Sequence, residues 1–328
     1  RSYFSVMKRR RWGQSGQALT AQPLQGVGGG FAAGGFAAGS SNEAVSWLGK
    51  MAEAMRQQNY QGIFSYIRGS NFDTVRIVHH SEDGIETERL INMNGEVREL
   101  YRQDDEILCF LPKGKEGTDC SLQIGPFTPA FPERVIATQN LYRLSMHKID
   151  RIAGRPAVTL SITPKLDDRY GYRVWLDKET GLMLQSHKVE RGRIREIFQF
   201  TMLEIGVDIE EIDLATSIEG ETVSYPLSFE FKKEQRGEPK LRVSWVPDGF
   251  KQVRKSGDRL HFSDGVATFS VFVDRSKKSA LSDMSTRVGG TVVISRRLNQ
   301  AGPQITVVGD VPMTTARRVA ESVEPLIY

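Results

Sequence analysis

The stretch Arg151–Leu203 reads RIAGRPAVTLSITPKLDDRYGYRVWLDKETGLMLQSHKVERGRIREIFQFTML, and it decides the fold class. Its segments Pro156–Pro164, Tyr170–Asp177, Leu182–Glu190 and Ile194–Leu203 are rich in Val, Ile, Thr and aromatic residues, and the last two turns contain glycine. The pattern predicts four consecutive antiparallel strands with no helix between them. A long sheet of this kind twists and curls, so one face becomes concave and can hold an apolar ligand.

The residues before this stretch predict one helix and five more strands. Ser40–Glu43 has the spacing of a capping box, and apolar residues follow at intervals of three and four: Ala44, Trp47, Leu48, Met51 and Met55. We expect this helix to reach about Gln57 and to back or plug the sheet. The predicted strands are Gln61–Arg68, Phe72–His80, Ile85–Met93, Val97–Arg102 and Glu106–Leu111.

Other segments are predicted from composition. Gly125–Glu133 holds three prolines, so we expect an exposed loop that covers the mouth of the sheet, whereas Val135–Met146 is weakly helical. Beyond residue 227, strands are predicted at Lys240–Val246, Arg259–Phe262, Val266–Asp274, Thr291–Arg297 and Gln304–Val308, a short helix at Ala280–Arg287 and a second helix at Pro312–Val323. The predicted organisation is a signal-like or disordered segment at 1–40, a first domain at 41–205, a linker at 206–227 and a second domain at 228–328.

The net charge of +4 conceals an uneven distribution. The first 40 residues carry +5, residues 41–224 carry −7 and residues 225–328 carry +6. This asymmetry supports two domains and gives the second an attraction for acidic partners. No basic stripe is interleaved with aromatic residues, so we expect no nucleic-acid binding. Met7–Trp12 and Phe36–Ser40 are similar to the ends of a secretory signal and favour export.

The chain has two cysteines, Cys109 and Cys120. Their spacing suits a disulfide across a hairpin in an oxidising compartment, with two free thiols as the alternative. No CxxC motif is present, so the pair does not indicate a zinc or thioredoxin-type site.

Catalytic and metal sites are not indicated. His79 and His80 are adjacent on a strand and point to opposite faces, so they cannot both ligate one ion. The sequence contains no G-x-S-x-G, G-x-G-x-x-G or P-loop motif. A pair of carboxylates from distant positions stays open. We therefore expect no enzyme activity, no cofactor and no metal.

Apolar and aromatic side chains of the first domain are the candidates for a ligand cavity. Most must be ordinary core, but one helix cannot fill a curled sheet, so a subset should line a groove whose membership depends on strand register. The candidates are Phe64, Tyr66, Val75, Ile77, Tyr170, Tyr172, Trp175, Phe198 and Phe200.

Short motifs are spread over the chain from about Val45 to Pro325: Asn59–Phe64, Asn94–Glu99, Arg151–Pro156, Arg169–Tyr172, Trp175–Asp177, Phe198–Phe200, Trp245–Phe250, Ser263–Gly265, Phe269–Val271, Val307–Pro312 and Thr315–Ala316. In these motifs the chain resembles the MucB/RseB family of periplasmic regulators of the sigma-E pathway. The resemblance implies an α+β fold: an unclosed antiparallel β-barrel with a helix, similar to LolA and LolB, followed by a smaller α/β domain with an antiparallel sheet.

The resemblance also implies a function in the periplasm. Members bind the periplasmic domain of a RseA/MucA-type anti-sigma factor and shield it from site-1 proteolysis, and lipid or lipopolysaccharide displaces them. We expect the cavity of the first domain to sense the lipid. The basic second domain would contact the anti-sigma segment, with Arg254, Lys255, Arg296 and Arg297 as candidates. The alternatives are a periplasmic lipoprotein or lipid carrier and an envelope hydrolase, and formation of a homo-oligomer stays open.

Overall fold

The computed structural model describes residues 41–325, apart from residues 96, 104–105, 113–126, 129, 217, 227–240, 257–258, 275–282 and 299–301. The signal-like segment predicted at 1–40 lies outside the described residues. Within the described part of the chain, no helix has the length and apolar character needed to cross a membrane.

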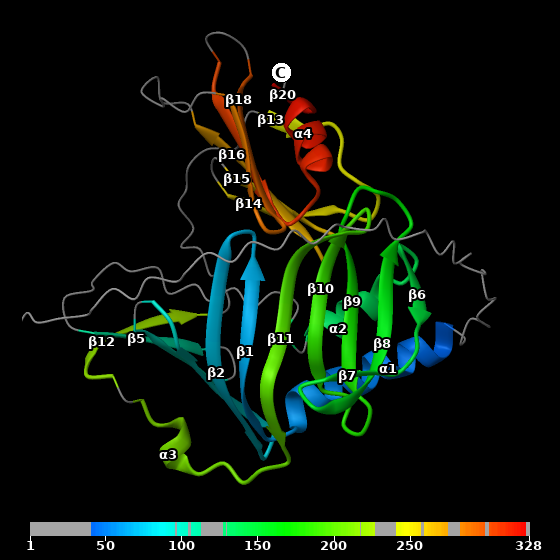
Figure 1. Cartoon of the computed structure of the whole chain (residues 1–328). Helices are drawn as coiled ribbons and strands as arrows, with labels where there is room; N and C mark the ends of the chain where they lie inside the picture. The colour runs from blue at the N-terminus through cyan, green and yellow to red at the C-terminus, as the bar shows by residue number, and fades with distance from the viewer. Residues whose placement is uncertain are drawn as a thin grey trace, which may run out of the picture. The chain divides into compact units, whose positions relative to one another are not determined.

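The larger sheet has 12 strands, and every pairing within it is antiparallel. Its order is β12-β5-β4-β3-β2-β1-β11-β10-β9-β8-β6, with β7 paired to β8, so the sheet is unclosed between β12 and β6 (Figure 1). The strands are β1 Tyr60–Arg68, β2 Asn71–Glu82, β3 Ile85–Asn92, β4 Glu99–Gln103, β5 Glu106–Pro112, β6 Tyr142–Met146, β7 Asp150–Ile152, β8 Arg155–Pro164, β9 Gly171–Asp177, β10 Met183–Glu190, β11 Arg193–Ile205 and β12 Gly220–Pro226.

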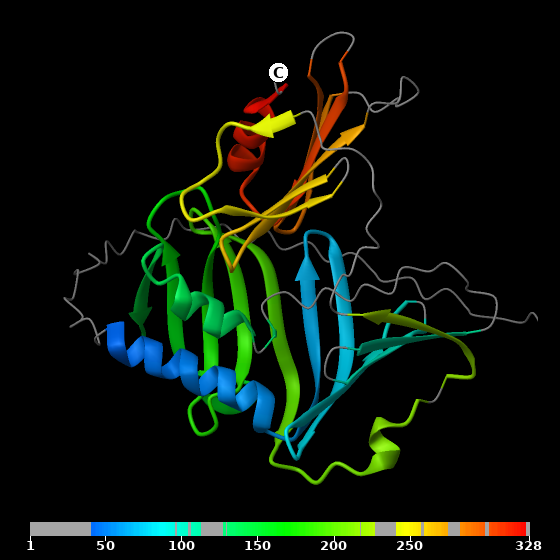
Figure 2. The ribbon, with the colours of Figure 1, turned by 180° about the vertical axis from the view of Figure 1, so that it is seen from behind.

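Two helices, α1 (Ser41–Gln57) and α2 (Ala130–Ala137), lie across the same face of this sheet (Figure 2). We call this the helix-covered face and the opposite one the helix-free face. The apolar stripe of α1 is buried as its spacing predicts, and Leu48 and Met51 are fully enclosed. Alternation along β1 turns Phe64 and Tyr66 toward the same side, where both are buried.

The rest of the chain forms a separate core around a second antiparallel sheet. Its order is β14-β15-β16-β19-β18-β17, and α4 (Met313–Glu321) packs on β18 and β19. The strands are β14 Lys251–Ser256, β15 Arg259–Ser263, β16 Thr268–Asp274, β17 Met284–Val288, β18 Thr291–Arg297 and β19 Gln304–Gly309, and β13 Leu241–Val243 pairs with β20 Val323–Pro325. The predicted fold class, an unclosed antiparallel half-barrel with a helix plus a smaller α/β domain, is confirmed.

Some predicted elements were wrong. The expected helix at Ala280–Arg287 is strand β17 where the structure describes it, because Met284–Val288 pairs with β18. Val135–Met146 is not one helix, since α2 ends at Ala137 and β6 begins at Tyr142.

The proline-rich segment and the predicted linker also differ from expectation. Of Gly125–Glu133, residues 125, 126 and 129 lie outside the described part, but Ala130–Glu133 opens α2, and Phe127 and Phe131 are buried rather than exposed. The range 206–227 contains helix α3 (Glu211–Leu214) and strand β12, which pairs with β5. Backbone hydrogen bonding to β5 makes this part of the range a strand of the first sheet. The domain boundaries themselves stay a prediction.

Candidate functional site: the aromatic face and its junction with the second sheet

Five aromatic rings, which we call the aromatic cluster, meet on the helix-covered face: Tyr60, Phe64, Phe127, Phe198 and Phe200. Phe64 and Phe200 are register partners on β1 and β11. Ring centroids are 4.8 Å apart for Phe64 and Phe198 and 4.6 Å apart for Phe127 and Phe198. Phe127 enters from the chain segment before α2 and contacts rings from both strands. The cluster therefore joins the sheet to the segment that covers it.

All the predicted cavity residues are buried, but they do not share one surface. All of them except Tyr170 belong to the apolar core of the first sheet. Tyr172 contacts Phe131 of α2, whereas Trp175 lies an odd number of residues along the same strand and turns to the helix-free face. There its indole Nε1 donates to Asp150. A lipid-binding role for these residues stays a prediction.

His79 extends the aromatic cluster and was not expected in it. Its ring stacks on Tyr60 with centroids 4.6 Å apart and planes at 5°. Nδ1 lies 2.9 Å from the carbonyl oxygen of Gln58 and therefore carries the proton, whereas the buried Nε2 has no hydrogen-bond partner in the described structure. Burial lowers the pKa of this imidazole. His79 is therefore a neutral histidine enclosed at one end of the aromatic cluster.

A buried ionic junction lies at the other end of the aromatic cluster. It is formed by Lys188, Glu196, Asp310, Tyr66 and Gly290. Lys188 Nζ lies 2.8 Å from a carboxylate oxygen of Glu196 and 2.8 Å from each oxygen of Asp310. Glu196 also accepts hydrogen bonds from the Tyr66 hydroxyl (2.7 Å) and the Gly290 amide (2.8 Å). Since Gly290 and Asp310 belong to the second sheet's connections, this junction joins the two sheets.

Electrostatics keep this junction charged. Burial lowers the pKa of Lys188, but the carboxylates of Asp310 and Glu196 outweigh burial and raise it above its usual value. Burial raises the pKa of Glu196, but its ion pair with Lys188 and its hydrogen bonds bring the pKa below the ordinary range. Breaking one partner would leave an uncompensated buried charge, which costs about 3–5 kcal/mol.

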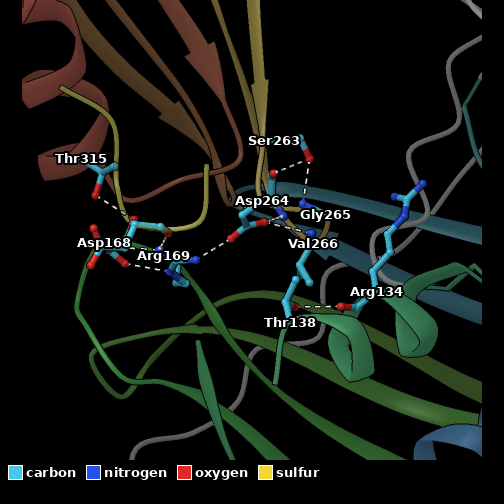
Figure 3. A network of polar contacts seen from close by, with 11 residues as sticks. Arg134, Thr138, Asp168, Arg169, Ser263, Asp264, Gly265, Val266 and Thr315 are labelled. Atoms are coloured by element: carbon cyan, nitrogen blue, oxygen red, sulfur yellow. Dashed lines mark hydrogen bonds and ion pairs between the residues drawn. The ribbon is translucent and has the colours of Figure 1, made fainter. Parts of the chain in front are cut away.

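A second junction is centred on Arg169, which Figure 3 shows between Asp168 and Asp264. Its guanidinium donates to Asp264 (2.6 Å), to Asp168 (2.8 Å) and to the carbonyl oxygen of Asp248 (2.5 Å). The other oxygen of Asp264 accepts the backbone N–H groups of Val266 and Ala267. The side chains of Arg169 and Asp264 are almost wholly enclosed, at 2% and 0% exposure. The pair is therefore a buried, fully hydrogen-bonded contact between the β8–β9 connection and the β15–β16 turn.

Both partners of the second junction lie in motifs that the sequence analysis singled out, but no role was predicted for either residue. Arg169 and Asp264 lie in the segments Arg169–Tyr172 and Ser263–Gly265. Tyr170, predicted for the cavity, instead donates its hydroxyl to the carbonyl oxygen of Val311 in the second part of the chain (2.9 Å). The only signal in the sequence was an Arg and an Asp in segments predicted as turns. Because a sequence does not show which charged residues are buried, this signal could not identify them as an ion pair.

The candidate anti-sigma contacts are not brought together. Arg254 and Lys255 lie on β14 at one edge of the second sheet, whereas Arg296 and Arg297 lie on β18, and β15, β16 and β19 separate them. Arg296 lines a pocket of about 420 Å³ whose walls come from β17, β18 and α4. Its guanidinium donates to the carbonyl oxygen of Ala320. Arg254 and Arg297 are exposed, and the side chain of Lys255 lies outside the described part.

Cys109 is buried on β5 and is disulfide-bonded. Cys120, the chain's other cysteine, lies outside the described residues, so the pairing stays a prediction. Among the residues that the structure describes, no three His, Cys, Asp or Glu side chains are grouped so as to hold a metal ion.

The fold and its junctions define a two-domain protein in which an unclosed antiparallel half-barrel with a buried aromatic face is held by ionic contacts to a smaller sheet domain. Its sequence matches the MucB/RseB N-terminal domain over residues 43–218 and the MucB/RseB C-terminal domain over residues 235–324. The chain belongs to the MucB/RseB family.

Named relatives are similar along most of the chain. The sigma factor AlgU regulatory protein MucB of Pseudomonas aeruginosa is 36% identical over 297 residues, which cover 86% of this chain and 91% of that protein. The sigma-E factor regulatory protein RseB of Haemophilus influenzae is 30% identical over 292 residues, covering 84% and 90%. The solved complex of P. aeruginosa MucA/MucB aligns with a TM-score of 0.71 at 34% identity, covering 87% of this chain and all (100%) of that chain.

Proposed function

We propose that this chain is a periplasmic regulator that binds the periplasmic region of a MucA/RseA-type transmembrane anti-sigma factor. The bound chain protects that region from site-1 proteolysis, and lipid or lipopolysaccharide releases the chain from the anti-sigma factor. The observation that carries the proposal is similarity over both domains to MucB, one of whose solved structures is a complex with MucA. Similarity confined to the first domain would support a carrier equally well.

The lipid-responsive part of the proposal is supported by the aromatic cluster. A half-barrel whose helix-covered face is lined by Phe64, Phe198 and Phe200, with Phe127 packed across them, offers apolar area for an acyl chain if that covering segment moves. Tyr66 sits in the same core and donates to Glu196 in the buried ionic junction. A ligand that displaced these rings would therefore act on the contact with the second sheet.

The protein-binding part is supported by charge and shape in the second domain. Residues 225–328 carry a net +6, and the pocket between β17, β18 and α4 is lined by Arg296 and Arg317 together with Asp283 and Glu321. A peptide segment that carries charges of both signs, with acidic groups facing the arginines, matches such a surface. The runner-up function, a periplasmic lipid carrier, is favoured by the aromatic cluster but leaves the second domain without a role.

Capture of the purified periplasmic segment of a MucA-type anti-sigma factor tests the proposal. The full chain should retain the segment, protect it from a DegS-type protease, and lose it when lipopolysaccharide is added. Failure to capture the segment with and without lipopolysaccharide would overturn the regulatory function. Binding of lipopolysaccharide without any capture would favour the carrier.

A pair of charge reversals locates the contact. Arg296→Glu should weaken capture, because it places a like charge in the pocket beside acidic groups of the segment. Lys251→Glu, an exposed charge reversal on β14 at the opposite edge of the sheet, serves as the control. Equal affinity of the wild type and Arg296→Glu would remove this pocket from the interface while leaving the overall function intact.

A further inference from the structure

A row of polar side chains crosses the helix-free face of the first sheet. Ser161 on β8, Arg173 on β9 and His187 on β10 are direct register partners. Side chains opposite one another on neighbouring strands have Cβ atoms about 4.5–5.5 Å apart. Tyr172 contacts α2, so its neighbour Arg173 points to the helix-free face, where it is exposed.

A second imidazole joins this row. His147 Nε2 lies 2.8 Å from the Ser161 hydroxyl oxygen, and Arg173 Nε donates to the same oxygen over 3.4 Å. At the other side of Arg173, the Gln185 amide lies 2.7 Å from His187 Nε2 and holds that nitrogen as an acceptor. His147 and Arg173 thus contact the Ser161 hydroxyl, and His187 lies beside Arg173 on its other side.

This cluster is not neutralised by acidic groups in the described structure. No carboxylate of the described residues lies within ion-pair distance of Arg173, whose hydrogen bond goes to Ser161. Burial lowers the pKa of His147 and His187, and the positive charge of Arg173 lowers both further. An anion placed beside Arg173 would remove this repulsion and allow the imidazoles to donate hydrogen bonds.

A pocket of about 170 Å³ opens beside Ser161 and Arg173. Two carboxylates line the same pocket, but both are already paired: Asp167 lies 3.1 Å from Arg191, and Glu190 lies 3.0 Å from Arg287. The charge left without a counterion in this pocket is therefore that of Arg173. A planar guanidinium matches the geometry of phosphate oxygens through two parallel hydrogen bonds.

We propose that Arg173, Ser161, His147 and His187 form a binding site for a phosphomonoester group on the helix-free face. The site lies on the opposite side of the sheet from the aromatic cluster and is independent of the function proposed above. Arg173 would bind two phosphate oxygens, Ser161 would donate its hydroxyl and the imidazoles would complete the shell. The phosphate can be free or the headgroup of a lipid, because the recognised chemistry is the same.

Calorimetric titration of the full chain at pH 7 and low salt tests the site with two probes. One is inorganic phosphate, and the other is phosphatidylcholine vesicles with and without phosphatidic acid. We expect binding of phosphate, of the phosphatidic acid vesicles, or of both, and the responding probe identifies the source of the group. Arg173→Gln should weaken that binding roughly tenfold or more, the usual size of a lost charge-assisted pair.

Arg134→Gln is the matched control, because it removes one exposed arginine from α2 on the other side of the sheet. It should leave the affinity unchanged. The imidazole NMR signals of His147 and His187 should shift on addition of the bound probe, a readout that does not depend on any variant. Equal affinity of Arg173→Gln and wild type, or no binding of either probe up to about 10 mM phosphate, overturns the proposal.

Discussion

His79 should make the stability of this protein fall in mild acid. Its imidazole is enclosed between Tyr60 and the Gln58 carbonyl, and burial lowers its pKa, despite the nearby Glu88, which is paired with Arg102. Because the folded pKa lies below the unfolded value of about 6.5, this contribution is present above that pH and is lost as the pH falls through the folded pKa. One proton changes the free energy of unfolding by up to about 1.4 kcal/mol per pH unit.

Urea unfolding at pH 7, 6 and 5 measures this dependence. His79→Phe keeps a ring on Tyr60 but cannot be protonated, so its free energy of unfolding should change less over this range than that of the wild type. The difference between the two proteins isolates His79 from the carboxylates and from the other histidines. If the free energy of unfolding of both proteins changes equally with pH, His79 has the same pKa in the folded and unfolded chain, and the prediction is wrong.

Strand alternation predicted that His79 and His80 point to opposite faces, and the structure agrees: His79 is fully buried and His80 is half-buried. The sequence could not tell which of the two is enclosed. That depends on which face α1 and the Phe127 segment cover, and this is decided by contacts between distant parts of the chain. The same limit applies to Trp175. Its large aromatic side chain suggests a cavity residue, but its position in the strand alternation places it on the opposite face of the sheet.

At the scale of an element, the turn from β17 to β18 should tolerate no side chain. A Cβ on Gly290 would lie 2.6 Å from Lys188 Cδ and 2.8 Å from an oxygen of Asp310. Gly290→Ala must therefore push the turn away from Glu196 and lengthen the hydrogen bond from its amide. We expect a loss of about 1–3 kcal/mol in the free energy of unfolding, together with faster hydrogen exchange of the Gly290 amide.

Gly49 in the middle of α1 is the control for this substitution. A Cβ there meets nothing within 4 Å, and the residue is exposed. Gly49→Ala should therefore raise the free energy of unfolding, by up to about 1 kcal/mol, because alanine loses less backbone entropy in a helix. Destabilisation by both substitutions would show that the effect at Gly290 does not come from its contacts with the first sheet.

The elements that sequence patterns predicted well are those with a strong period of their own. The α1 stripe and the β8–β11 meander repeat apolar residues at helical or strand spacing, and both formed as expected. Met284–Val288 has no such period because most of its side chains are exposed at a sheet edge, so only pairing with β18 makes it a strand. Gly220–Pro226 became a strand for the same reason, through β5.

For the whole molecule, charge asymmetry and motif order predicted two domains but not how they are joined. Each junction is centred on one buried, positively charged side chain, Lys188 or Arg169. Each of these side chains contacts an acidic residue more than 90 residues away in the chain. Sequence composition records such residues as ordinary surface charges. Their pairing follows only from the register that brings β9, β10 and β11 to the turns of the second sheet.

The Arg169 junction should make the two domains unfold together. Arg169→Gln leaves Asp264 enclosed without its cation, and this costs about 3–5 kcal/mol while loosening the contact of the first domain with the β15–β16 turn. Differential scanning calorimetry should show one transition for the wild type and two separated transitions for this variant. The double variant Arg169→Gln/Asp264→Asn should recover part of the lost stability, because no buried charge is then left alone.

Arg242→Gln supplies the comparison for an ion pair that does not join the domains. Arg242 lies 2.9 Å from Glu324, but the two side chains are 63% and 46% exposed, so solvent screens the pair. Its loss should cost less than about 1 kcal/mol and leave one transition. If Arg169→Gln behaves in the same way, the domains are coupled through the apolar and backbone contacts around Tyr170 instead, and a signal reaching the first domain would have to pass to the second through those contacts.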